Sequence, residues 1–293
     1  MHYTSHSEYL PLASVYLKSA ADAFIDDHKL KREWYQLNYL EMPDLSRAKE
    51  EYSVFETLLK NTATTIHYFP RAEQLSLDAL YCRDASIATN RGMIICNMGK
   101  AGRKLEPAAQ AALFEHHGIP ILGSITAPGT LEGGDVAWLN EKTLAVGYTY
   151  RSNLEGIRQL KELLLPMGID VVVADLPHYR GVEDVFHLMS ILSPVDKDLA
   201  VVYSPLMPIR FRNLLLDMGY ELVEVPDTEF ESMGCNVLAV GPRKCIMVSG
   251  NPITRNALEA AGCEVTTYKG GEISVKGGGG PTCLTRPLHR FLP

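Results

Sequence analysis

The C-terminal stretch GGGGPTCLT, residues 277–285, carries one cysteine in an unusual setting. Cys283 follows four consecutive glycines, which are costly to order but let a backbone approach a ligand closely. Thr282 and Thr285 place hydroxyl groups on either side of it. A lone cysteine often packs as a small buried hydrophobe, and that alternative suits the other five cysteines. For Cys283 the setting predicts a nucleophilic thiol.

Two further stretches could supply the groups that a thiol nucleophile needs. His187 lies in DVFHLMSIL, and histidine is the side chain that moves protons near neutral pH, although a hydrogen-bonded core histidine is the alternative. In TLEGGDVAW, Glu132 and Asp135 flank two glycines. We predict that Asp135 is a substrate-binding carboxylate, although it could instead cap a polar turn. A turn between apolar strands does not require Glu132, so we interpret it as a functional carboxylate.

Two more carboxylates and two arginines complete the candidate set. Asp78 and Asp84 stand six residues apart around a strand-like apolar run, a spacing that puts both on one face of an extended chain. Several carboxylates near a thiolate would repel it unless the ligand is a cation, and a planar guanidinium fits. Arg103 and Arg151 could hold the carboxylate of an amino acid that carries this guanidinium, or could be solvated surface charges.

A repeat along the chain could bring these residues together. Four stretches begin with a polar residue and continue as strand, short polar turn and second strand; they start at Asp84, Asp135, His187 and Asn236, about 50 residues apart. Cys283 follows at the same interval, so it is in register with the repeat. If the units surround an axis, their starts converge on one site.

Helical patterns and further strands complete each unit. The segments LSRAKEEYSVFETLLK, EPAAQAALFEHHG and SNLEGIRQLKELLLPMG have helical spacing of apolar residues, and strands such as TTIHYFP, IPILG and IDVVVAD follow them. We therefore predict an α/β fold in which five strand-rich units, one helix each, form a five-bladed β/α propeller. An ordinary open α/β sheet is the alternative, although no glycine-rich phosphate loop opens a helix.

Composition limits the cellular setting and the partners. The formal charge is −7 and is spread along the chain without a basic run, which argues against a nucleic-acid partner. No apolar run reaches the ~18 residues of a membrane span. The six cysteines show none of the close paired spacing of zinc sites, so we predict no metal site. The N-terminus lacks the basic and apolar regions of a signal peptide, which predicts a cytoplasmic protein with reduced thiols. The oligomeric state stays open, a homodimer included.

Taken together, the motifs TLEGGDV, FHLMS and GGGGPTCLT, in this order, resemble those of the guanidine-modifying enzymes, or penteins, over nearly the whole chain. The resemblance implies a single catalytic domain over residues 1–293 with the five-bladed propeller fold. It implies that Cys283 is the nucleophile, His187 the general acid and base, and Glu132 the residue that orients the histidine. Asp78 and Asp84 then match the guanidinium-binding acids, and Arg103 and Arg151 the grip on the α-carboxylate.

Within the superfamily the sequence is most similar to the dimethylarginine dimethylaminohydrolases. It departs from arginine deiminases and amidinotransferases at Met189, where those enzymes usually carry the Asp of His-x-Asp. It departs from the dimethylaminohydrolases at Arg83-Asp84, which resembles the deiminase form more than their common Glu-Asp. The implied reaction releases citrulline and an amine from a methylated arginine through a thiouronium intermediate, without a cofactor. Arginine deimination, arginine dihydrolysis and amidino transfer remain alternatives, as does a non-catalytic binding protein, which would not need Cys283, His187 and Glu132 together.

Overall fold

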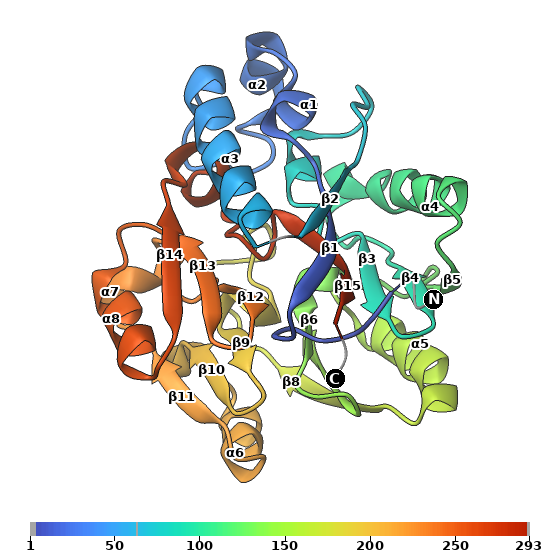
Figure 1. Ribbon diagram of the computed structural model, residues 1–293. Helices are drawn as coiled ribbons and strands as arrows, with labels where there is room; N and C mark the ends of the chain where they lie inside the picture. The colour runs from blue at the N-terminus through green and yellow to red at the C-terminus, as the bar shows by residue number, and fades with distance from the viewer. Residues whose placement is uncertain (1–3, 63, 292–293) are drawn as a thin grey trace.

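A computed structural model describes residues 4–62 and 64–291 of the chain. Its strands form five separate sheets of three strands each, arranged around a common centre (Figure 1). The prediction of five strand-rich units is confirmed, and the alternative of one open sheet is wrong. Along the chain, the sheets comprise β15 (Thr285–Arg290), β1 (Leu12–Leu17) and β2 (Thr65–Tyr68); β3 (Ser86–Thr89), β4 (Gly92–Ile95) and β5 (Ile121–Ser124); β6 (Val136–Trp138), β7 (Thr143–Tyr148) and β8 (Asp170–Asp175); β9 (Leu192–Asp196), β10 (Leu199–Val202) and β11 (Glu221–Glu224); β12 (Leu238–Gly241), β13 (Lys244–Val248) and β14 (Glu264–Tyr268).

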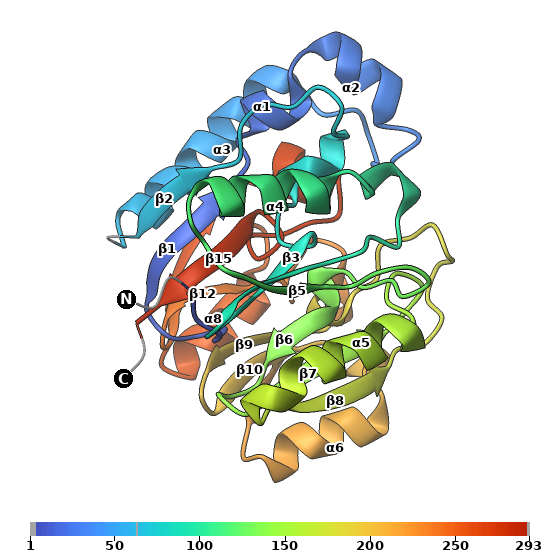
Figure 2. The same ribbon diagram turned by 90° about the vertical axis from the view of Figure 1, so that its right-hand side faces the viewer.

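Every sheet repeats the same pairing. Its first two strands are antiparallel, and its third strand returns parallel to the second after a helical crossover. The crossover helices lie on the outside of the ring, as Figures 1 and 2 show. They are α3 (Leu45–Lys60), α4 (Glu106–His116), α5 (Leu154–Leu164), α6 (Ile209–Asp217) and α8 (Pro252–Ala260), and the shorter helices are α1 (Ala20–Phe24), α2 (Asp27–Glu33) and α7 (Asp227–Phe230).

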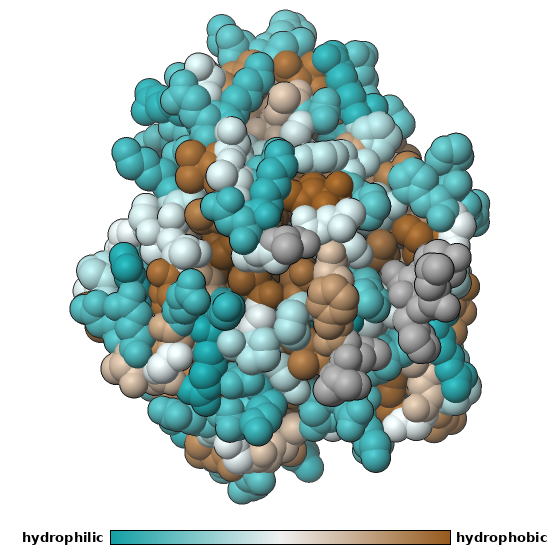
Figure 3. Space-filling view, viewed as in Figure 1, coloured by the Kyte–Doolittle hydropathy of each residue, from teal (hydrophilic) through white to brown (hydrophobic). Residues whose placement is uncertain are grey.

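The two ends of the chain close the ring. The strand β1, near the N-terminus, pairs antiparallel with β15, near the C-terminus, and the register sets Leu17 opposite Thr285. The unit that ends in Cys283 is therefore completed by the start of the chain. Figure 3 views the side where both chain ends lie, on which hydrophilic residues cover most of the rim and hydrophobic ones show near the middle.

Local sequence signals set the helix limits. The predicted helix over residues 45–60 coincides with α3, whose first turn is capped by the Asp44 side chain accepting from the Arg47 amide. Asn153 caps α5 in the same way, by accepting from the Gly156 amide. After α5, a short 3₁₀ turn leads to Gly168 with a φ of 67°, the left-handed conformation that favours glycine.

The residues that open each unit lie in turns, not on the strands as expected. The apolar run after Asp78 forms a 3₁₀ turn, Leu77–Leu80, because its leucines pack into the interior instead of joining a ladder. His187 precedes another such turn, Leu188–Ser190, and β9 begins only after it.

Among the described residues, no helix is long and apolar enough to cross a membrane.

Candidate active site

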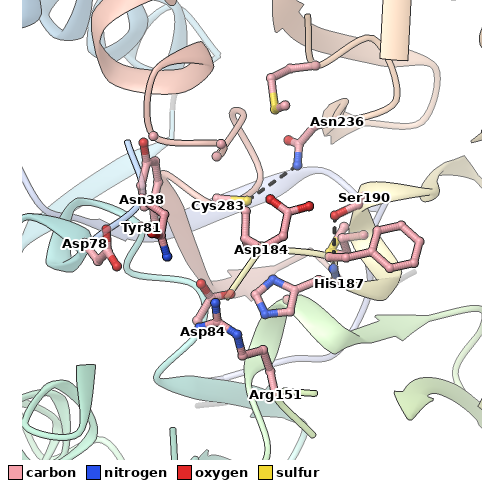
Figure 4. Close-up of a pocket in the computed structure, with 18 of the residues that line it drawn as sticks. Asn38, Asp78, Tyr81, Asp84, Arg151, Asp184, His187, Ser190, Asn236 and Cys283 are labelled. Carbon is pink, nitrogen blue, oxygen red and sulfur yellow. Dashed lines mark hydrogen bonds between the residues drawn. The ribbon is translucent and has the colours of Figure 1, made fainter. Parts of the chain in front are cut away.

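A pocket forms where the starts of the five units converge (Figure 4). Each unit contributes at least one side chain to the lining from the turn before its first strand, and five of these carry the predicted chemistry or stand at the start of a repeat. These side chains are Cys283, Asp84, Glu132, His187 and Asn236. The geometric argument from the repeat thus brings the predicted nucleophile, histidine and carboxylates to one place.

His187 and Glu132 form a buried hydrogen-bonded pair. The imidazole Nε2 lies 2.8 Å from Glu132 Oε2, and the glutamate is fully buried. Burial opposes the carboxylate charge, yet the hydrogen bond and the charge of His187 lower the pKa of Glu132 to about 2. Burial also opposes the imidazolium, but the carboxylates of Asp135, Asp84 and Glu132 raise the pKa of His187 to about 9. At neutral pH the histidine therefore carries a proton that it can donate.

Asp135 supports His187 from behind and has a different task from the one expected. Its Oδ1 accepts from the Leu188 amide at 3.1 Å, and its Oδ2 accepts from the hydroxyls of Ser152 at 2.6 Å and Thr149 at 2.7 Å. It is fully buried and does not line the pocket. The expectation that Asp135 binds substrate is corrected: its oxygens are filled by protein donors that fix the turn after the histidine.

The two glycines of TLEGGDV let this turn pack against the site. A Cβ at Gly134 would lie 2.5 Å from His187 Nδ1 and 2.7 Å from Asp84 Oδ1. At Gly133 it would lie 2.4 Å from the Arg83 carbonyl oxygen. No side chain can occupy these positions without displacing the His187 imidazole or the chain before Asp84.

Cys283 is partly exposed to the pocket, whereas the other five cysteines are buried. Its Sγ accepts from Asn236 Nδ2 at 3.5 Å, and the Thr282 hydroxyl lies at 3.8 Å. Burial and the charge of Asp84 raise the pKa of the thiol, outweighing the opposite effects of both contacts and of Arg83. These surroundings favour the thiol over the thiolate, whereas a cationic ligand would favour the thiolate.

Asn236 is a site residue to which the sequence interpretation gave no role. Its Oδ1 accepts from the backbone amide of Thr282 at 3.0 Å and from the Thr282 hydroxyl at 2.9 Å. It thereby anchors the turn that carries Cys283 while donating to the sulfur. Its position at the start of the fourth repeat was the signal that could have identified it.

The glycine run before Cys283 packs closely on two side chains. A Cβ at Gly277 would lie 1.9 Å from the Tyr81 hydroxyl, and one at Gly279 would lie 2.4 Å from the same ring. At Gly280 a Cβ would lie 2.4 Å from Asn236 Oδ1. Bare backbone is required to bring the cysteine turn against Tyr81 and Asn236.

Asp84 and Asp78 both line the pocket from buried positions. Asp84 Oδ2 accepts from Arg103 Nη1, while its Oδ1 is buried and has no hydrogen-bond partner within the described part of the chain. Asp78 pairs with Lys100 at 2.6 Å. Lys100 also lines the pocket and was missed, although it stands close to Arg103 in the sequence.

The two predicted arginines differ in how free they are. Arg103 donates through Nε and Nη2 to Glu106, both at 2.8 Å, and also to Asp84 and the Tyr81 carbonyl. At most one of its five N–H groups remains for a ligand, so its main task is to hold Asp84 and not to grip a substrate carboxylate. Within the described residues, the Arg151 guanidinium makes one hydrogen bond, of 3.3 Å to the Glu183 carbonyl, and one ion pair, of 3.9 Å with Glu132.

One group of side chains in the described residues could receive a cation. Single ligand atoms of Asp84, Glu132 and His187 all lie within 4.8 Å of one another. A metal ion would have to displace the proton that His187 holds with a pKa of about 9. An organic cation with N–H groups need not displace this proton, because it can donate to Asp84 Oδ1, which has no partner within the described residues. The arrangement therefore favours an organic cation at neutral pH.

Five three-stranded units around a pocket with a thiol, an imidazole and buried carboxylates define a pentein propeller. The fold matches a mutant dimethylarginine dimethylaminohydrolase from Pseudomonas aeruginosa, complexed with citrulline, with a TM-score of 0.77, 22% identity, and coverage of 96% of this chain and 100% of that one. It also matches a saxitoxin-pathway amidinotransferase from Microseira wollei, with a TM-score of 0.80, 15% identity, and coverage of 99% and 98%.

The family follows from the sequence. The profile of the family described as N,N dimethylarginine dimethylhydrolase, eukaryotic, matches residues 19–290, and the chain belongs to this family. An arginine deiminase from Mycoplasma capricolum is 25% identical over 333 residues, which cover 94% of this chain and 82% of that protein. The family is thus one of guanidino-modifying hydrolases, related to enzymes of arginine metabolism.

Proposed function

We propose that the protein hydrolyses the guanidinium group of arginine or a methylated arginine, producing citrulline and an amine. The observation that carries the proposal is the unpartnered Oδ1 of Asp84, a buried acceptor in the same pocket as Cys283 and the His187–Glu132 pair. A buried acceptor without a donor is costly, and a guanidinium N–H would satisfy it. The citrulline complex of the Pseudomonas aeruginosa relative supports a ureido product.

The first half-reaction forms a bond between Cys283 Sγ and the central guanidinium carbon. Binding of the cationic substrate stabilises the thiolate, so the thiol proton leaves to solvent. As the sulfur attacks, the imidazolium of His187 gives its proton to the departing amine and the carbon–nitrogen bond breaks. A thiouronium group then links the substrate to the enzyme.

The second half-reaction returns the enzyme to its starting state. Neutral His187 takes a proton from water, and the resulting hydroxide attacks the thiouronium carbon. The carbon–sulfur bond breaks and Cys283 leaves as a thiolate, while the added hydroxyl group loses its proton as the ureido carbonyl forms. One proton returns to the sulfur, so Cys283 is again a thiol and His187 again an imidazolium. Glu132 stabilises the imidazolium in both half-reactions and holds its ring, and no organic cofactor or metal enters the sequence of steps.

Met189 bears on the choice between methylated and plain arginine. It is buried, lines the pocket and stands where deiminases usually carry the Asp of His-x-Asp. A thioether tolerates methyl groups but accepts hydrogen bonds poorly. An unpaired guanidinium N–H costs about 1 to 3 kcal/mol, so we expect arginine to react more slowly than its methylated forms by roughly ten- to hundredfold.

The experiment compares arginine, monomethylarginine, dimethylarginine and agmatine in an assay for ureido product. In Met189→Asp, the ratio of kcat/KM for methylated over plain arginine should fall. A native protein that prefers arginine by a wide margin would instead be an arginine deiminase, the second candidate, which the Mycoplasma capricolum relative favours. Adding an amine acceptor tests amidino transfer, and absence of all turnover would leave a binding protein.

A further inference from the structure

The segment from residue 179 to 186 lines one wall of the pocket and leads directly into His187. The Glu183 carbonyl accepts from Asn38 Nδ2 at 3.1 Å and from Arg151 Nη2 at 3.3 Å. Further back, the Tyr179 hydroxyl and Arg180 Nη2 both donate to Glu231 Oε1, at 2.7 and 2.6 Å. Contacts on both sides of the pocket therefore hold the segment in place.

Asp184 extends from this segment into the pocket, as Figure 4 shows. Its side chain is partly buried, which raises its pKa, and the Val185 amide is a hydrogen-bond donor to it. Within residues 4–62 and 64–291 no ion pair of Asp184 is found, and the neighbouring Arg180 pairs with Glu231. Arg180 and Arg151 act on Asp184 only at longer range, where their charges lower its pKa against the effect of burial.

Arg151 stands on the same wall as Asp184. Both residues line the main pocket and also an adjoining cavity bounded by Tyr148 and His178, so they lie between the two spaces. Arg151 has the positive charge that a substrate carboxylate needs. An anion beside that cation, at the mouth of the pocket, forms a receptor for a zwitterion.

Three of the charges that line the pocket stand in an order that matches one class of molecule. Asp84 is 2% exposed and offers its free oxygen in the interior, whereas Arg151 and the more exposed Asp184 lie together on the wall. An arginine-type amino acid carries a guanidinium at one end and a carboxylate with an ammonium at the other. We propose that Asp184 binds the α-ammonium group, an assignment that rests on the proposed function.

This assignment makes Asp184 a specificity-determining residue, separate from the chemistry at Cys283. A desamino analogue, 5-guanidinopentanoate, keeps the guanidinium and the carboxylate but lacks the ammonium. The native protein should therefore favour the amino acid over this analogue. The preference should depend on the charge at residue 184 and not on the Arg151 contact, which both compounds make.

The test measures kcat/KM for the best amino-acid substrate and for its desamino analogue in the native protein, Asp184→Asn and Asp175→Asn. Asp175 is exposed, ends β8 and does not line the pocket, so it is the charge-matched control. In Asp184→Asn, the value for the amino acid should fall roughly ten- to hundredfold, as expected for a lost charged hydrogen bond. The value for the analogue should change by less than about threefold, and the control should change neither.

Where the analogue turns over too slowly, its inhibition constant against the amino acid replaces kcat/KM. Equal losses on both compounds, or no loss on either, would overturn the role of Asp184 while product formation by the native protein upholds the proposed function. If the native protein converts no guanidino compound, the proposed function fails and the inference fails with it.

Discussion

Two buried groups of charged side chains meet at adjacent residues of the chain. Asp84 belongs to the carboxylate cluster, whose other members are Glu106, Glu132, Asp135, Arg103 and His187. Arg83, one residue earlier, belongs to the arginine cluster, whose other members are Glu8, Arg286 and Arg290. The first cluster lines the pocket through several members, and the second contributes no residue to it.

The arginine cluster is held mainly by backbone carbonyls. Arg83 Nη2 donates to Glu8 Oε1 at 2.8 Å, and Arg286 Nη1 donates to the carbonyls of Arg83 and Ser86. Burial lowers the pKa of Arg286 to about 9 and that of Arg290 to about 10. Among the residues that the structure describes, the buried side-chain atoms of this cluster without a hydrogen-bond partner are donors: Nε and Nη1 of Arg83, and Nε and Nη2 of Arg290.

The difference shows that buried charge becomes a candidate site only where it meets a pocket and a nucleophile. The carboxylate cluster leaves an acceptor, Asp84 Oδ1, in the pocket that also contains Cys283. Arg83, whose pairing with Asp84 in sequence resembles arginine deiminases, instead pairs with Glu8 away from the pocket. In this chain only the aspartate of that dipeptide faces the ligand space.

The largest effect should come from removing the nucleophile. Cys283→Ser should lower kcat by about 10⁴-fold or more, because a hydroxyl is a far weaker nucleophile toward the guanidinium carbon. Unchanged circular dichroism and melting temperature would show that the fold is intact. Brief iodoacetamide treatment followed by mass spectrometry should find Cys283 labelled first, since the other cysteines are buried. Substantial turnover in the variant would refute the assignment.

The next effect concerns the charge pair inside the carboxylate cluster. Glu132→Gln should lower kcat about 10³- to 10⁴-fold, because the imidazolium loses its orienting carboxylate. The pKa of His187 is raised to about 9, so native kcat/KM should decline as the pH rises through about 9 and the acid proton is lost. In the variant this decline should move to lower pH. A pH profile that does not move would show that Glu132 is not coupled to the histidine.

A third substitution tests whether Arg151 binds the substrate carboxylate or only supports the pocket wall. Arg151→Ala should weaken binding of amino-acid substrates by about 2 to 5 kcal/mol, seen as a raised KM, because a buried partner of the carboxylate is lost. Agmatine has no carboxylate, so its kinetic constants should change little. Equal losses on both substrates would indicate that Arg151 mainly supports Glu132 and the Glu183 segment.

A substitution in the arginine cluster should lower the stability of the protein and leave its catalytic constants unchanged. Glu8→Gln leaves the buried Arg83 without its paired carboxylate and removes a negative charge that acts on Arg286 and Arg290, and breaking such a buried pair costs about 3 to 5 kcal/mol of folding free energy. Urea denaturation should report this loss, while kcat/KM below the new melting temperature should equal the native value. A kinetic defect in folded Glu8→Gln would mean that the two clusters are coupled through Arg83 and Asp84.

The sequence by itself determined the repeat and the elements within it. Apolar spacing and capping residues act over a few positions, so the limits of α3 and the order of strands could be predicted. The regular starts of the units also placed Cys283 and His187 at one centre with Asp84, Asp135 and Asn236, because equivalent points of a closed ring face its axis. The resemblance to penteins then added the roles of Cys283, His187 and Glu132.

Only the tertiary structure decided which side chain of each turn faces the pocket. Glu132 and Asp135 are three residues apart, yet one reaches His187 Nε2 in the pocket and the other binds the Leu188 amide behind it. The partners of Asn236 and Asp84 likewise depend on contacts with other units or turns. Local propensity cannot encode these choices, because turn direction and long-range hydrogen bonds are set when the ring closes and each buried polar atom finds its partner.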